Sequence, residues 1–197
     1  MKKLSLLAGA LLACFMQVNA QDFVSTDPTN RNVIIEEFTG RNCGYCPDGH
    51  KIANQICHDN PGRVWAVNVH AGGYAPTSYP NFNTPESNTI LNGFNVSGFP
   101  SGAVNRSDYT ALNRGQWASA AAQQMGQVAE CNVAGQAVIN PATRMAKITV
   151  EVYYTGNSTV DANYLTVMML QDSIMGSQSG GSSNPEQMVN GQYCHMH

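Results

Sequence analysis

The pattern of hydrophobic and polar positions predicts alternating strands and helices over the first 130 residues. Residues 33–38 are β-branched and apolar, and residues 64–69 repeat this character, so both segments are predicted as strands. Between them, residues 43–58 carry apolar side chains on one face, which predicts a helix. Further along, the pattern predicts a short helix at 86–94, a short strand at 102–105 and a longer helix at 113–129. This order of elements is typical of an α/β domain.

The pattern changes after Cys131. Residues 133–139, 145–154 and 164–171 alternate or run apolar, with turn residues between them, which predicts three strands. We therefore place a domain boundary near residue 130 and expect an all-β domain over residues 131–197. A closed β-sandwich needs roughly seven strands, so we expect this second domain to be incomplete.

The segment from His70 to Pro100 is rich in Gly, Pro, Asn, Ser and Tyr. Connections of this length in compact domains tend to be functional or mobile. Three aromatic residues within it, Tyr74, Tyr79 and Phe82, either form a peptide-binding surface or anchor the loop to the domain. The sequence leaves both interpretations open.

Residues 1–20 predict a secretory signal that is not part of the fold. Lys2 and Lys3 precede an apolar stretch of moderate length, and Val18-Asn19-Ala20 places small side chains before the predicted cleavage site. A lipoprotein signal, with Cys14 as a lipid anchor, is the alternative. In either case we expect export to the periplasm or the outer membrane, with the cell surface included.

Charge and cysteine content bear on the partners of the protein, its attachment to the membrane and its disulfides. Charged residues make up only 12% of the chain and form no basic patch, so nucleic acid is not expected as a partner. The mature chain carries eight basic and thirteen acidic residues and has no second long apolar run, so we expect it to be soluble or peripherally attached to the membrane. Five cysteines remain in it, in a compartment where disulfides persist. Since five is odd, at least one thiol is unpaired within a monomer.

The pair Cys43-Gly44-Tyr45-Cys46 is the main candidate for chemistry. It follows a predicted buried strand and lies at the predicted start of a helix, where backbone N–H groups and the helix dipole favour a thiolate. Of the remaining cysteines, Cys57 is expected to act as a small core residue. Cys131 and Cys194 are candidates for a disulfide within the β-domain, but the sequence does not establish their pairing.

Two other residues are expected beside this dithiol. Strand alternation lets only one of Glu36 and Glu37 point inward, and we assign that position to Glu37. A buried carboxylate there would have a raised pKa and would accept the proton of Cys46. The segment around Phe99-Pro100 is a candidate cis-proline turn opposite the dithiol.

The spacing of Cys43, Cys46 and His50 also raises a zinc site as an alternative. Such a site needs a fourth ligand, and the sequence does not supply an obvious one, so we predict neither a metal nor a cofactor. We interpret His50 as a solvated helix residue rather than one that tunes the thiolate.

The segment from Glu37 to Cys46 resembles the strand-to-helix segment of the thioredoxin superfamily. A glutamate six positions before the first cysteine is the pattern of eukaryotic disulfide isomerase domains, and the Gly-Tyr dipeptide is similar to that of the bacterial periplasmic disulfide isomerase. The resemblance implies that Pro100 is the cis-proline. The chain departs from thioredoxin at Asn42, where an aromatic residue is common, and in a longer segment between Cys46 and Pro100.

A second resemblance covers Val33–His50, Gly98–Arg106 and Asn184–Gln187. These segments resemble an outer membrane protein family of Bacteroidetes-type bacteria that is named for a twenty-eight-kilodalton member. The resemblance implies a thioredoxin-like domain over residues 21–130 and an immunoglobulin-like β-domain after it. Some members of that family carry an adhesin or receptor label, which is a different functional class.

Two functions follow as hypotheses. The first is an exported thiol–disulfide oxidoreductase or isomerase that acts on protein thiols and disulfides and depends on a further redox partner. In it, Cys43 attacks, Cys46 resolves the mixed disulfide, Glu37 carries a proton and Pro100 holds the substrate. The residues expected to contact that substrate are Gly44, Tyr45, Phe99 and Tyr74. The second hypothesis is an outer-membrane-associated adhesin or receptor in which the same cysteines form a structural disulfide and the loop from 70 to 100 is displayed.

Overall fold

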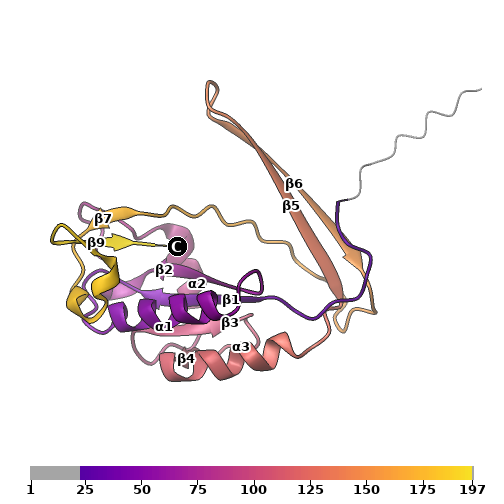
Figure 1. The fold of residues 1–197 in the computed structure, drawn as a ribbon, viewed down its shortest axis with the longest axis horizontal. Helices are drawn as coiled ribbons and strands as arrows, with labels where there is room; N and C mark the ends of the chain where they lie inside the picture. The colour runs from indigo at the N-terminus through magenta and orange to yellow at the C-terminus, as the bar shows by residue number, and fades with distance from the viewer. Residues whose placement is uncertain (1–22, 197) are drawn as a thin grey trace, which may run out of the picture.

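A computed structural model describes residues 23–196 of the chain (Figure 1). The predictions for a signal at 1–20 and for Cys14 lie outside these residues. A four-stranded mixed sheet forms the centre, in the order β2-β1-β3-β4. The strands are β1 (Val33–Thr39), β2 (Val64–His70), β3 (Ser101–Val104) and β4 (Leu112–Asn113). Only the β1–β2 pair is parallel, and the strands predicted at 33–38, 64–69 and 102–105 are confirmed.

Helices cover both faces of this sheet (Figure 1). On one face, α1 (Cys46–Asp59) and α3 (Trp117–Met125) pack on Val33 and Ile35 of β1. On the other face, α2 (Pro85–Asn92) packs on Phe38 and on residues of β2. This division follows from the alternation of side chains along β1, which sends odd-numbered residues 33 and 35 toward α1 and even-numbered residue 38 toward α2. The predicted short helix at 86–94 is confirmed.

Two helices differ from the sequence prediction in their bounds. The helix after β1 begins at Cys46 rather than at residue 43, because residues 43–45 form a turn that ends in the cap residue Tyr45. The helix predicted at 113–129 divides into a 3₁₀ turn, η2 (Arg114–Gln116), and the shorter α3. Asn113 caps the 3₁₀ turn with its side chain, and Gly126 caps the end of α3. A short 3₁₀ turn, η1 (Gly72–Tyr74), follows β2.

The region after residue 130 forms two small antiparallel sheets. The first is a hairpin of β5 (Cys131–Asn140) and β6 (Met145–Tyr154), which projects away from the central sheet in Figure 1. The strand predicted at 164–171 is wrong, because no neighbouring strand pairs with this segment. The second sheet has the order β7-β9-β8. Its elements are β7 (Ile174–Gly176), η3 (Gly181–Ser183), η4 (Pro185–Gln187), β8 (Met188–Val189) and β9 (Gln192–His195). The immunoglobulin-like identity and the boundary near 130 stay predictions.

The second small sheet packs back onto the α/β part of the chain. The side chain of Asn68 on β2 donates a hydrogen bond of 2.7 Å to the carbonyl of Met196. The ring of His195 on β9 lies against Phe82, with 4.5 Å between ring centroids. The η3 turn of the same region contacts α1, so the C-terminal sheet lies beside the helix that begins at Cys46.

Candidate functional site

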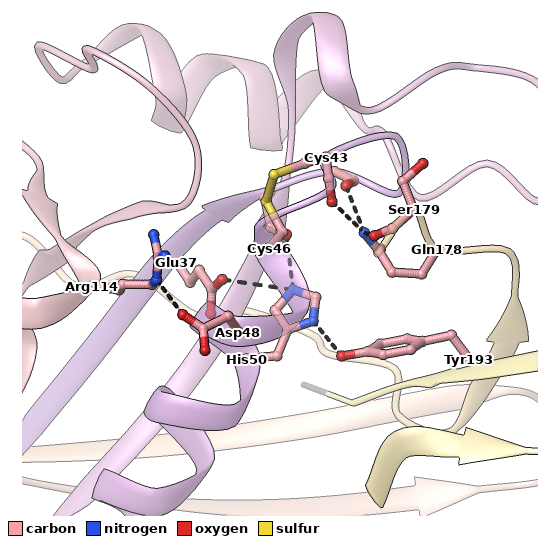
Figure 2. The surroundings of a disulfide bond; sticks show 11 residues. Glu37, Cys43, Cys46, Asp48, His50, Arg114, Gln178, Ser179 and Tyr193 are labelled. Carbon is pink, nitrogen blue, oxygen red and sulfur yellow. Dashed lines mark hydrogen bonds and ion pairs between the residues drawn. A yellow bond between two sulfur atoms is a disulfide. The ribbon is translucent and has the colours of Figure 1, made fainter. Parts of the chain in front are cut away.

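Cys43 and Cys46 form a disulfide at the junction of β1 and α1 (Figure 2). Cys43 lies in the turn that follows β1, and Cys46 is the first residue of α1. The two residues are 2% and 0% exposed. The disulfide is therefore near a helix start, as the sequence predicts, but it is covered rather than open to solvent.

Glu37 lies beneath this disulfide and is fully buried, which confirms the predicted inward direction of its side chain. Neither carboxyl oxygen has a hydrogen-bond partner among the described residues. Burial raises the pKa of Glu37 well above its ordinary value, with a smaller lowering by Arg114 and a smaller raising by Asp48. At neutral pH, burial thus favours the protonated carboxyl.

The neighbouring Glu36 corrects one expectation. It lies on the opposite face of the sheet, as alternation requires, yet it is only 2% exposed. Its two carboxylate oxygens each accept a hydrogen bond of 2.6 Å from the guanidinium of Arg106. A paired arginine therefore lets two consecutive glutamates be buried on opposite faces of one strand.

Gly49 and Pro100 complete the space around Glu37. The Phe99–Pro100 peptide bond is cis, as predicted. A Cβ atom at Gly49 would lie 2.5 Å from Oε1 of Glu37 and 2.9 Å from two ring carbons of Pro100. The absence of a side chain at Gly49 thus allows α1 to approach the carboxyl and the proline together.

The predicted substrate-contact residues lie around the disulfide with different exposures. Tyr45 is 72% and Tyr74 50% exposed, Gly44 is exposed and Phe99 is half-buried. The rings of Tyr74 and Phe99 pack on each other with 5.4 Å between their centroids. In the same loop Tyr79 is exposed, whereas Phe82 packs on His70 and His195. Of the three loop aromatics, Phe82 therefore serves as an anchor.

The interpretation of His50 as a solvated residue is wrong. Its side chain is buried, and it follows Cys46 by one helical turn, so it points toward β1. Nε2 lies 2.9 Å from Oγ1 of Thr39 and 3.7 Å from Oε1 of Glu37. Nδ1 lies 2.8 Å from the hydroxyl of Tyr193 on β9 (Figure 2).

A charge pair, Arg114 and Asp48, lies at the rim of this site. The guanidinium donates a hydrogen bond of 2.5 Å to Oδ2 of Asp48, and both side chains are partly exposed. Figure 2 shows the pair on the side of Glu37 away from Tyr193. Sequence reasoning identified neither residue, since their only signal is an ordinary surface charge.

Residues 178–180 cover the turn that carries Cys43. The side-chain amide of Gln178 donates hydrogen bonds to the carbonyls of Cys43 (2.9 Å) and Gly40 (3.3 Å). The next backbone N–H, that of Ser179, donates to the carbonyl of Arg41 at 2.8 Å. Gly180 adopts φ +72° and lies so close to the carbonyl of Gly44 that a Cβ atom would collide with it. These contacts hold residues 178–180 against the turn that carries Cys43.

The remaining cysteines are free thiols. Cys57 is partly buried against the α1-side core, as expected, and burial raises its pKa. Cys131 lies on β5 and Cys194 on β9, and they do not pair with each other. Among residues 23–196, no group of three His, Cys, Asp or Glu side chains is placed to hold a metal ion.

Comparison with known proteins now adds the family. Residues 87–197, more than half of the chain, match the family described as outer membrane protein Omp28. This chain belongs to the Omp28 family. Among the described residues, no helix has the length and apolar character needed to cross a membrane.

One solved structure supports the fold. The chain is similar to HBP35 of Porphyromonas gingivalis, with a TM-score of 0.56 and 17% sequence identity. The similarity covers 86% of this chain and 55% of HBP35, so the chain spans little more than half of that structure. No curated protein matches this chain significantly.

Proposed function

We propose that this Omp28-family protein is an exported thiol–disulfide oxidoreductase whose residues 21–130 form a thioredoxin-like domain. The observation that carries the proposal is the Cys43–Cys46 disulfide near the buried carboxyl of Glu37 (Figure 2). The position of the disulfide between β1 and α1, the sheet order β2-β1-β3-β4 and the cis bond before Pro100 support it as well. A perturbed carboxyl beside a redox-active sulfur is the arrangement that proton transfer during disulfide exchange requires.

In the reduced protein, the Cys43 thiolate attacks one sulfur of a substrate disulfide. A mixed disulfide forms, and the other substrate sulfur leaves as a thiolate that takes a proton from water. Cys46 then loses its proton by way of the Glu37 carboxyl and attacks the sulfur of Cys43. This step closes the Cys43–Cys46 disulfide and releases the second substrate sulfur as a thiolate that takes a proton from water, so two electrons pass from the protein to the substrate.

A protein substrate would meet the side of the site that carries Tyr45, Tyr74 and Phe99. Exposed aromatic rings supply apolar contact area at low entropic cost. We propose that Pro100 and Gly44 hold the substrate backbone near the sulfurs. The Gly-Tyr dipeptide between the cysteines favours a reductase or isomerase over a strong oxidant.

The covered disulfide adds a condition to this chemistry. Cys43 is 2% exposed, and residues 178–180 lie against its turn. A protein disulfide therefore reaches Cys43 only after these residues move. Gln178 is half-buried and Ser179 and Gly180 are exposed, which is typical of segments that open at low free-energy cost.

A second candidate function is an outer-membrane-associated adhesin or receptor with a structural disulfide. The burial of both cysteines and the coverage of Cys43 favour it, since structural disulfides are buried and resistant to reduction. In that case the exposed Tyr45, Tyr74 and Tyr79 would belong to a binding surface.

Trapping of mixed disulfides separates the two functions. A Cys46→Ala variant, expressed in the host as the full chain, retains the attacking Cys43 but lacks the residue that resolves its intermediates. If the protein is an oxidoreductase, reducible covalent adducts with other proteins accumulate on this variant. They should be absent from a double variant that also carries Cys43→Ala, and a matched Cys57→Ala variant should accumulate none. Equal adduct levels in the Cys46→Ala variant and in the double variant would favour the adhesin or receptor.

A further inference from the structure

The most unusual buried group in the site is the imidazole of His50. It is 2% exposed and lies against three side chains from two other elements. These are Thr39 and Glu37 on β1 and Tyr193 on β9. In a buried histidine between a carboxyl and a tyrosine hydroxyl, the hydrogen bonds of the two ring nitrogens determine which nitrogen carries the proton.

The hydrogen bonds around Tyr193 determine which nitrogen of His50 carries the proton. The Tyr193 hydroxyl has one proton, and it donates that proton to the amide oxygen of Gln187, which only accepts. Asn184 donates to both of these oxygens, at 3.2 Å and 2.7 Å. With its own proton committed, the hydroxyl of Tyr193 must accept from His50. Nδ1 of His50 therefore carries a proton. The lone pair of Nε2 accepts a hydrogen bond of 2.9 Å from the hydroxyl of Thr39, and Oε1 of Glu37 lies 3.7 Å from the same nitrogen.

We propose that His50 is a proton-relay residue of the redox site, held by Tyr193 in the tautomer that accepts a proton from Glu37. This inference rests on the proposed oxidoreductase function and names two residues beyond its cysteines, carboxyl and proline. Tyr193 acts through His50 and is a positioning residue. The C-terminal sheet then contributes Tyr193 to the redox site.

The relay answers a difficulty in the simpler mechanism. Burial favours the protonated form of the Glu37 carboxyl, and in that form it has no capacity to accept a second proton from Cys46. When the hydroxyl of Thr39 rotates away from Nε2, transfer of the Glu37 proton to Nε2 of His50 leaves a carboxylate and an imidazolium side by side. The carboxylate then takes the proton of Cys46, and the Cys46 thiolate attacks Cys43. In sum, one proton moves from sulfur to nitrogen, and no other reactant is needed.

The geometry is close to that required. The Nε2–Oε1 distance of 3.7 Å exceeds a hydrogen bond, but contacts of this kind are often long in resting sites and tighten during reaction. The charged groups that face the pair are Asp48 on α1 and Arg114 on η2, which are paired with each other. On the side of β9, Tyr193 also contacts the ring of His195.

The tautomer is tested directly by nitrogen NMR of the full mature chain labelled at histidine. The relay predicts a protonated Nδ1 and an unprotonated Nε2 at His50, assigned by the loss of its signals in His50→Gln. Tyr193→Phe should move the proton toward Nε2. A wild-type ring with its proton on Nε2 would contradict the inference, and this measurement depends on no variant being active.

Kinetics supply the second test. Reduced protein is mixed with oxidised glutathione from pH 5 to 9, and the closure of the mixed disulfide is followed by rapid quench. We expect His50→Gln to slow closure at least about tenfold, as for a lost general acid–base group, and Tyr193→Phe to slow it less. The control is His58→Gln, on the exposed end of the same helix, which should match wild type.

Two outcomes distinguish the inference from the function on which it rests. Normal formation of the mixed disulfide with unchanged closure in His50→Gln, at every pH, would overturn the relay alone. Failure of the wild-type protein to form any mixed disulfide would overturn the oxidoreductase function and the relay with it.

Discussion

The hydroxyl of Tyr193 lies 2.8 Å from Nδ1 of His50, although the two residues are 143 positions apart in the chain. The contact joins the C-terminal β7-β9-β8 sheet to the helix that carries Cys46 (Figure 2). Because both side chains are buried, neither exchanges this partner for water without local opening of the structure. Changes in the C-terminal sheet should therefore reach the chemistry of the disulfide.

Glu37 predicts a pH dependence of stability. Its pKa is raised in the folded chain, so the folded state binds a proton that the unfolded chain releases above about pH 4.5. Stability therefore falls as pH rises through and above that value, with a slope of up to about 1.4 kcal/mol per pH unit. Glu37→Gln lacks this group. The difference between its free energy of unfolding and that of the wild type should therefore shift in favour of the variant as pH rises from 5 to 7. Urea unfolding of the oxidised proteins checks this, and parallel pH profiles would contradict it.

The histidine pair in the C-terminal packing predicts the opposite dependence. Burial lowers the pKa of His70 to about 3, with a smaller lowering by His195. Burial also lowers the pKa of His195 to about 4, against a smaller raising by the backbone of Ser177 and with a smaller lowering by Arg41. The folded state therefore binds fewer protons than the unfolded chain, and stability is lost as pH falls from about 6.5 toward 4.

Replacement of one histidine should weaken this acid sensitivity. We expect His195→Phe to reduce the slope of stability against pH by up to about 1.4 kcal/mol per pH unit, one proton's worth. Unfolding by urea at pH 6.5, 5.5 and 4.5 measures the slope. The exposed His58→Phe is the control, and an equal slope in both variants would show that His195 is not held neutral.

Gln178 predicts the accessibility of Cys43. Its amide makes two hydrogen bonds to the turn that carries this cysteine, and a hydrogen bond contributes roughly 1 kcal/mol net. Gln178→Ala should therefore raise the population in which Cys43 is open on the order of tenfold. The rate of iodoacetamide reaction with the reduced protein reports this population. The control is Gln136→Ala, on the exposed strand β5, which should leave the rate of reaction unchanged. An unchanged rate in Gln178→Ala would show that Gln178 does not cover the Cys43 thiol.

Gly49 predicts a packing limit at the centre of the site. An added Cβ would meet Oε1 of Glu37 and the ring of Pro100, so Gly49→Ala should cost about 1–3 kcal/mol of stability, as overpacking does. Gly135→Ala on β5 is the matched control, because nothing lies within 4 Å of its added carbon. Thermal unfolding of the two variants compares them, and an undisturbed Gly49→Ala protein would show that α1 is free to shift.

Local patterns were enough to predict much of the site. The apolar alternation of β1 places Glu37 on the same face as Ile35, and the strand–turn–helix order places the cysteines above it. The motif around Phe99-Pro100 identified the cis bond. Each of these depends on residues close together in sequence.

Other parts depend on tertiary contacts that no local pattern contains. A polar residue on a helix is typical of a solvent-facing position, and the burial of His50 is compensated by tertiary contacts of its ring with Thr39 and Tyr193. Tyr193 itself lies in a short strand without distinctive alternation. Conversely, residues 164–171 have the composition of a strand but no strand beside them to complete a sheet.

The reduction potential of the Cys43–Cys46 disulfide tests the central claim most directly. Equilibration of the purified mature protein with glutathione buffers of known potential gives the value, with the redox state read by alkylation and mass spectrometry. An oxidoreductase predicts a potential above about −300 mV, within reach of cellular thiol couples. A potential well below about −300 mV is that of a structural disulfide and would contradict the proposed function.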